Sequence, residues 1–146
     1  QDSSSAASDV YKRQILFLET LGHAQNPALV IKEAAKLLKP GGFIYCKDFF
    51  PFEIKDEALQ EKHKKVIENI NRSYAYNVLN LHETIASFRK NKLELTFIKK
   101  PQFQDDITAR FNFEQQFEID LFGDMEEFRV AEWLELKFTK PLARLF

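Results

Sequence analysis

The chain has 146 residues, and its 21 lysines and arginines nearly balance 22 aspartates and glutamates, which leaves a formal net charge of −1. This balance gives no electrostatic reason to expect a nucleic acid or an anionic membrane as a partner. The 45% share of hydrophobic residues, including 15 phenylalanines, argues for the packed core of one ordinary domain and against disorder.

The first 14 residues form a polar segment ahead of the first hydrophobic run. The stretch "SSAASDVYKRQ" (4–14) can be reverse-translated into the adapter and transposase end sequence of tagmentation libraries. The sequence therefore predicts that residues 1–14 are a translated adapter and that the native part, 15–146, begins inside its domain. The alternative is a natural disordered N-terminal arm.

The native part opens with the pattern of a strand–helix–strand unit. The apolar run "ILFLE" (15–19) predicts a strand buried on both faces, and "FIYCKDFF" (43–50) predicts the next strand. Between them, residues 27–38 predict a helix that Asn26 caps and that Pro27 suits at its first turn. A helix that connects two strands in this way implies a right-handed crossover and parallel pairing.

The second half of the chain predicts two helices and two strands. Residues 54–75 and 80–90 have the spacing of amphipathic helices, whereas 93–100 and 128–138 alternate as strands do. The connection 101–127 is too long for a hairpin turn, so it is either a covering loop or a short extra element.

No apolar run approaches the roughly 18 residues that a membrane helix needs. The single cysteine, Cys46, excludes a disulfide framework and fits a reducing, cytoplasmic compartment. It lies inside an apolar run, so we expect a buried structural thiol and not a nucleophile.

The stretch "LETLGHAQNPALVIKEAAKLLKPGGFIYCKDFF" (18–50) resembles the C-terminal half of class I S-adenosylmethionine-dependent methyltransferases of the ubiquinone, sterol and phosphoethanolamine type. The shared features are an acid that ends the fourth strand, a histidine a few residues later, and a Leu-Lys-Pro-Gly-Gly turn. In this chain these features are Glu19, His23 and residues 38–42.

This resemblance implies an α/β fold, a truncated Rossmann-like methyltransferase sheet of strands four, five, seven and six with flanking helices. In that sheet the strand at 15–19 would be an edge, and the strand at 128–138 would run antiparallel to both of its neighbours. Residues 51–78 would form a lid over the substrate.

Two features of the family are missing from the chain. The glycine-rich loop after strand one and the acid that ends strand two both precede strand four, and the four glycines here form no Gly-x-Gly. The sequence therefore predicts a fragment of a methyltransferase for a small-molecule or lipid acceptor, inactive by itself.

The resemblance also implies site residues around the end of the first strand. Glu19, Thr20 and His23 would contact S-adenosylmethionine, and His23 and Glu19 would be the catalytic residues. A histidine can take a proton from a hydroxyl or amine acceptor, and a carboxylate can stabilise positive charge that develops on an alkene acceptor.

The substrate contacts are expected at the end of the neighbouring strand. Ligands of open α/β sheets bind beyond the carboxyl ends of the strands, at the point where the strand order reverses. Asp48, Phe49 and Phe50 end that strand and are predicted to bind the substrate. No metal site is predicted.

Two other function classes remain open from the sequence. The unit could be half of a nucleotide-binding oxidoreductase, in which the strands would all be parallel. It could also be a non-catalytic pseudoenzyme or interaction module, because the loop that would bind the cofactor is not in the chain.

Overall fold

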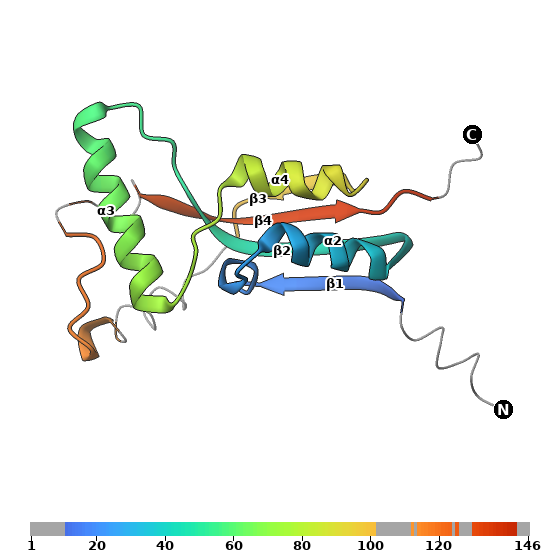
Figure 1. The fold of residues 1–146 in the computed structure, drawn as a ribbon, viewed down its shortest axis with the longest axis horizontal. Coiled ribbons are helices and arrows are strands. Elements are labelled where there is room, and N and C mark those ends of the chain that lie inside the picture. The colour runs from blue at the N-terminus through green and yellow to red at the C-terminus, as the bar shows by residue number, and fades with distance from the viewer. Residues whose placement is uncertain (1–10, 102–111, 113, 124, 126–129, 143–146) are drawn as a thin grey trace.

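The computed structural model describes residues 11–101, 112, 114–123, 125 and 130–142. They form a mixed four-stranded sheet with helices packed against it (Figure 1). The elements in chain order are β1 (Lys12–Leu18), a 3-10 helix η1 (Leu21–His23), α2 (Pro27–Leu37), β2 (Leu38–Pro51), α3 (Glu57–Tyr74), α4 (Leu81–Lys90), β3 (Glu94–Lys99) and β4 (Ala131–Thr139).

The strand order is β1-β2-β4-β3, with β1 at one edge. Strands β1 and β2 are parallel, and β4 runs antiparallel to both β2 and β3. This arrangement confirms the predicted fold class, the predicted strand order and the antiparallel closure. It also argues against the oxidoreductase half, whose strands would all be parallel. Residues 128–129 of the predicted last strand lie outside the described residues.

Strand β1 begins at Lys12, three residues before the predicted start at Ile15. Residues 12–14 pair with β2 through their backbones, and their side chains are exposed. Gly42 allows this approach, because a Cβ there would lie 2.7 Å from the carbonyl oxygen of Arg13. Extended pairing of this kind needs no particular side chains, so the core does not depend on which residues occupy 12–14.

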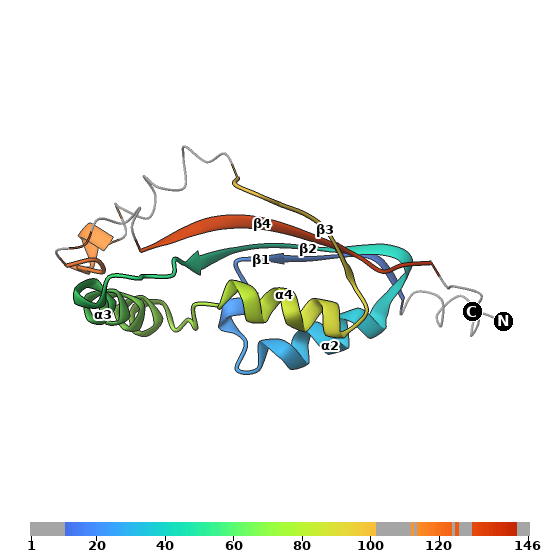
Figure 2. The same ribbon diagram turned by 90° about the horizontal axis from the view of Figure 1, so that it is seen from above.

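The main core lies between the sheet and the helices α2 and α4, which cover the same face (Figure 2). Ile44 and Leu136 are fully buried on that face, and the rings of Phe88 and Phe138 stack with centroids 4.1 Å apart. Helix α2 begins where the sequence predicted, because the Asn26 side chain accepts a hydrogen bond from the Leu29 amide at 3.1 Å.

A second cluster joins helix α3 to the start of strand β4. Val66 and Ile70 of α3 pack in it with Phe49 and Trp133. His63 of α3 also bonds the carbonyl oxygen of Val130 at 2.8 Å. Most of the predicted lid segment is therefore a packed helix in this structure.

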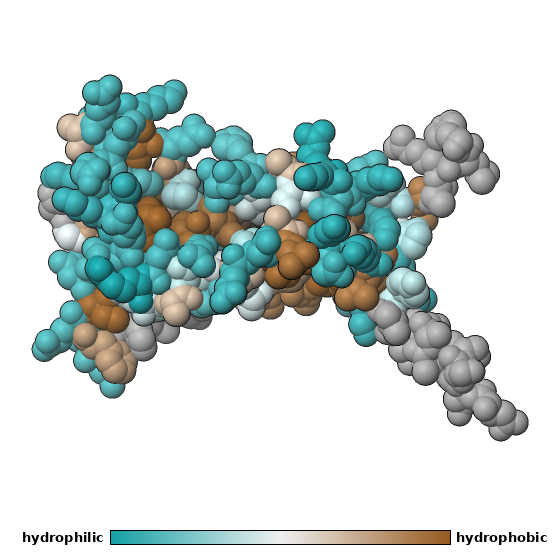
Figure 3. Space-filling view, in the orientation of Figure 1, coloured by the Kyte–Doolittle hydropathy of each residue, from teal (hydrophilic) through white to brown (hydrophobic). Residues whose placement is uncertain are grey.

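Within the described part of the chain, no helix covers the middle of the sheet on the side opposite α2 and α4 (Figure 2), whereas at one end Phe49 on that side packs in the second cluster with α3. Leu16 and Leu18 of β1 point to that side and are 54% and 51% exposed. The helix-bearing side is different: hydrophilic residues cover much of it, with smaller hydrophobic patches between the elements (Figure 3).

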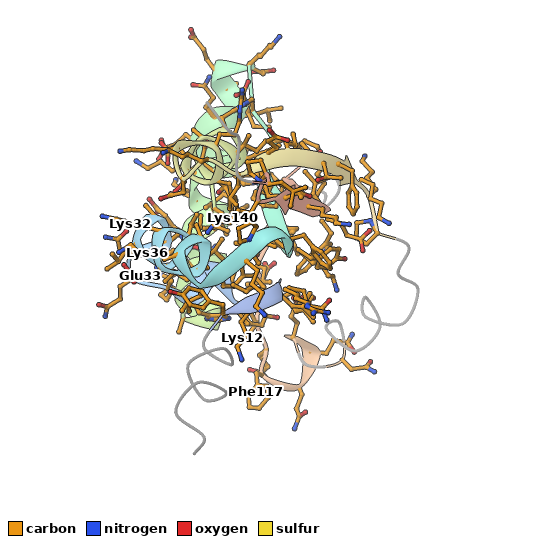
Figure 4. The ribbon with its side chains drawn as sticks, turned by 90° about the vertical axis from the view of Figure 1, so that its right-hand side faces the viewer. Lys12, Lys32, Glu33, Lys36, Phe117 and Lys140 are labelled. Atoms are coloured by element: carbon orange, nitrogen blue, oxygen red, sulfur yellow. The ribbon has the colours of Figure 1, made fainter. Side chains whose placement is uncertain are left out.

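The C-terminal end of helix α2 is capped by a residue that follows β4. The Lys140 ammonium donates hydrogen bonds to the carbonyl oxygens of Ala35 and Leu38, at 2.9 and 2.8 Å. Figure 4 shows Lys140 beside this helix. Such a cation satisfies carbonyls that a helix end leaves without intrahelical partners.

No helix within the described ranges is long and apolar enough to cross a membrane.

Candidate functional site

The candidate site lies where β1 ends and the chain turns into η1. Glu19 has a φ of +56°, the left-handed conformation that costs a non-glycine residue about 1–2 kcal/mol. Its amide donates to the Lys47 carbonyl oxygen at 2.8 Å, so the last rung of the β1–β2 ladder holds this turn. Thr20 follows, and its carbonyl oxygen accepts a hydrogen bond from the His23 amide at 3.1 Å. A strained residue at the carboxyl end of a parallel strand is typical of a ligand-binding loop.

The Glu19 carboxylate is already paired. It lies 2.9 Å from the ammonium of Lys47, whose side chain is only 14% exposed and sits 5.5 Å from the Trp133 ring centroid. The pair fixes the direction of the Glu19 side chain at the entrance of the loop. A carboxylate whose direction is fixed in this way presents a negative charge at a defined place.

His23 is held by its Nδ1 atom, which lies 3.1 Å from the carbonyl oxygen of Ala75. A carbonyl oxygen can only accept, so Nδ1 carries the proton and the neutral imidazole has Nε2 as its acceptor. The rings of His23 and Tyr76 form a T-shaped contact with centroids 4.8 Å apart. The connection between α3 and α4 therefore determines both the tautomer and the orientation of His23.

Asp48 is fully buried and faces the loop. Its Oδ1 atom accepts the Phe49 amide at 2.8 Å. Burial raises the pKa of this carboxyl to about 6. The amides of Phe49 and Gly22 lower the pKa in part. The charge of Glu19 raises it slightly, and His23 lowers it slightly. A carboxyl with this pKa is able to exchange a proton near neutral pH.

The two phenylalanines predicted beside Asp48 pack in the two hydrophobic clusters. Phe50 is buried in the main core, and Phe49 points to the other side of the sheet, where its ring centroid is 5.1 Å from that of Trp133. Alternation along the strand places Phe49 on the face opposite to Asp48, whereas Phe50 shares the face of Asp48 and is buried in the core there. The structure thus brings together Glu19, Thr20, His23 and Asp48, whereas the two rings serve packing.

Sequence reasoning overlooked Tyr76 as part of this site. Its ring lies on Gly22, where an added Cβ would be 2.1 Å from Cζ. The Asn77 amide bonds the Gly22 carbonyl oxygen at 2.8 Å and holds the same segment on the loop. The only sequence signal for this contact is a glycine within η1, and a glycine there does not reveal which ring will cover it.

Two further predictions concern chemistry near the site. Cys46 is fully buried, and burial raises the pKa of its thiol, so the thiol is a core residue as predicted. Within the described residues, no cluster of histidine, cysteine and acidic side chains could hold a metal ion.

No protein-family model matches the sequence. No curated protein sequence matches it either. Solved structures do match, and they have the Rossmann-like fold of S-adenosylmethionine-dependent methyltransferases, so the fold of this chain is part of that fold.

Three solved structures illustrate the likeness. The [4+2]-cyclase SpnF is 14% identical with a TM-score of 0.60, and the match covers 92% of this chain and 51% of the cyclase. A Galdieria sulphuraria protein with a proposed sarcosine dimethylglycine methyltransferase activity is 14% identical with a TM-score of 0.63, covering 90% and 54%. Geranyl diphosphate C-methyltransferase from Streptomyces coelicolor, solved with its substrate and S-adenosylhomocysteine, is 11% identical with a TM-score of 0.57, covering 88% and 47%. The chain therefore spans about half the length of these proteins.

Proposed function

We propose that this chain is the C-terminal part of an S-adenosylmethionine-dependent methyltransferase that acts on a small-molecule or lipid acceptor. The observation that carries the proposal is the antiparallel insertion of β4 between β2 and β3, combined with a turn at the end of β1 that presents Glu19 and His23. The solved methyltransferases with this fold support it. We further propose that residues 1–14 do not belong to the native enzyme.

The residues at the end of β1 fit the charge of the cofactor. S-adenosylmethionine supplies an electrophilic methyl group on a positively charged sulfur when it is bound. The fixed carboxylate of Glu19, which is 46% exposed, would offer it a negative charge, and the Thr20 and His23 backbones would offer hydrogen bonds. The remainder of the cofactor site would come from a segment that precedes β1 in the parent protein.

The chain's own residues would position the acceptor and handle its proton. Methyl transfer is an in-line displacement, so the main catalytic task is to hold the acceptor in line with the methyl group. His23 has Nε2 as its proton acceptor because Ala75 holds Nδ1, so it would take the proton of a hydroxyl or an amine. Asp48 would contact the acceptor from the neighbouring strand.

Two calorimetric titrations with S-adenosylmethionine test the truncation. We expect no saturable binding to the 146-residue chain, because a few hydrogen bonds of about 1 kcal/mol each do not offset the several kcal/mol of lost translational and rotational freedom. The chain joined to the preceding part of its gene should bind saturably. A micromolar isotherm from a monodisperse 15–146 sample would refute the truncation.

Two substitutions in the extended protein test the site. His23→Ala removes the proposed proton acceptor, so turnover should fall about 10²–10⁴-fold while the melting temperature changes little. Glu19→Gln should also lower turnover more than stability. His82→Ala is a matched control, because His82 is an exposed surface residue that pairs with Glu53 at 3.1 Å. Full turnover in both site variants would make the two residues structural.

A further inference from the structure

Two polar atoms beside η1 are buried without a hydrogen-bond partner among the described residues. They are Oδ2 of Asp48 and the hydroxyl of Tyr76. Buried polar atoms nearly always have a partner, and leaving one without a partner is costly. The two orphaned atoms come from different parts of the chain, since Asp48 lies near the end of β2, three positions before its last residue, Pro51, and Tyr76 lies in the connection between α3 and α4.

Both groups lie against the same residue, Gly22. The Gly22 amide faces the Asp48 carboxyl and acts to lower its pKa, and a Cβ at Gly22 would lie 2.5 Å from the Tyr76 hydroxyl oxygen. Neither atom has a partner, so they are not bonded to each other. A small ligand group beside Gly22 is therefore within reach of both.

We propose that Asp48 Oδ2 and the Tyr76 hydroxyl together bind the reacting atom of the methyl acceptor, and that this atom is a hydroxyl oxygen or an amine nitrogen. The proposal rests on the proposed methyltransferase function and adds the class of acceptor to it. An ionised carboxylate can only accept, so its partner must carry a hydrogen. A phenol can donate to a lone pair or accept a second hydrogen, so it suits the same heteroatom.

An alkene carbon does not satisfy either group. It has neither an acidic hydrogen for Asp48 nor a lone pair for Tyr76, and its presence would leave both atoms orphaned. A donor-bearing ligand would lower the raised pKa of Asp48, because it would form a hydrogen bond to the charged carboxylate.

Access to the two atoms requires the segment after α3 to move. Tyr76 covers Gly22, and the segment is tied to the loop by Ala75 on His23 and by the Asn77 amide on the Gly22 carbonyl. Opening the loop would break these two hydrogen bonds, while the bond from the Tyr76 amide to the Asn71 carbonyl oxygen at 2.9 Å would keep the segment attached to α3. His23 lies at the same hinge, which couples its orientation to the arrival of the acceptor.

The test compares three probes with the same six-membered ring and different polar groups: cyclohexanol, cyclohexanone and cyclohexylamine, which carries a positive charge at neutral pH. The ketone has the same ring but no hydrogen to donate. Each probe is titrated into the 146-residue chain, and the amide resonances of Gly22 and Phe49, which report on Asp48, are followed by nuclear magnetic resonance. The alcohol and the amine should bind about tenfold more tightly than the ketone, the effect of one hydrogen bond to a charged group.

Substitutions show whether the probes bind through the polar groups of Asp48 and Tyr76 or only by burying their ring. Asp48→Asn places an amide donor beside the acceptor, so the preference for alcohol over ketone should disappear or reverse. Tyr76→Phe should weaken alcohol and amine binding several-fold. Tyr74→Phe is the matched control and should change nothing, because the Tyr74 hydroxyl bonds Glu114 at 3.1 Å in another part of the molecule.

Equal affinities for alcohol and ketone in the unaltered chain would overturn the proposal. So would the absence of any saturable shift at Gly22 and Phe49, or an unchanged preference in Asp48→Asn. The measurement contains no cofactor and no turnover. If the extended protein failed to bind S-adenosylmethionine, the proposed function would be rejected, but the measured preference among the probes would stand. If the probes showed no preference, this inference would be rejected, but cofactor binding would stand.

Discussion

The buried carboxyl of Asp48 makes a quantitative prediction about stability. Its pKa rises from 3.8 to about 6 on folding, mainly because burial disfavours the charged form. A raised pKa in the folded state means that the folded chain binds more protons. The stabilising contribution of the protonated group is therefore complete below the unfolded pKa and is lost as the pH rises through 6. The full difference corresponds to about 3 kcal/mol.

The substitution Asp48→Asn removes this titration and retains an oxygen for the Phe49 amide. We expect the free energy of unfolding of the unaltered chain, relative to that of the variant, to fall by about 1.4 kcal/mol between about pH 5 and pH 7.5. The free energy of unfolding of the variant, relative to that of the unaltered chain, should therefore be higher at neutral pH than at pH 5. Other carboxyls titrate in both proteins and cancel in the comparison.

Urea unfolding at a series of pH values measures this difference, with circular dichroism to follow the transition. A difference that is independent of pH between 5 and 7.5 would refute the reasoning, because it would mean that Asp48 has its ordinary pKa in the folded chain. A difference that grows as the pH rises would refute it too, since it would require a lowered pKa.

Three other changes have expected outcomes. Gly22→Ala places a Cβ 2.1 Å from the Tyr76 ring, so it should cost about 1–3 kcal/mol in urea unfolding, and Tyr76→Ala in the same chain should recover most of the loss. Lys140→Met removes the two bonds that cap α2 and should cost about 1–2 kcal/mol, whereas an unchanged midpoint would show that water replaces the cap. Deletion of residues 1–11, which precede β1, should leave the melting temperature unchanged, and a loss of several degrees would make that arm native structure.

The sequence predicted the order and direction of the strands because each strand has a recognisable pattern of its own. The run at 15–19, the capped helix after Asn26 and the Pro-Gly-Gly sequence, which the structure places in the first part of β2, define the crossover unit. The alternation along 131–138 reflects one buried and one open face, and the structure shows that alternation. The fold class follows from these local signals together with the rule on crossover handedness.

The site was less accessible to prediction because it is made of long-range contacts. Glu19 and His23 could be placed at a strand end from the pattern alone. Nothing in the pattern indicates that Lys47 pairs with Glu19 or that Tyr76 covers Gly22. Phe49 and Asp48 point to opposite faces because they are adjacent on the strand, which their shared place near the strand end does not reveal.

The position of β4 has a consequence for how quickly the chain folds. In the described part of the sheet, β3 has β4 as its strand neighbour, and β4 also pairs with β2, so residues near position 43 meet residues near position 139. These pairings close long loops before they gain any stabilisation, which is the property of slowly folding topologies. We therefore expect the docking of β4 between β2 and β3 to be the rate-limiting step of folding. Until it docks, β2 and β3 expose unpaired edges, and the partly folded chain is at its most vulnerable to association with other copies.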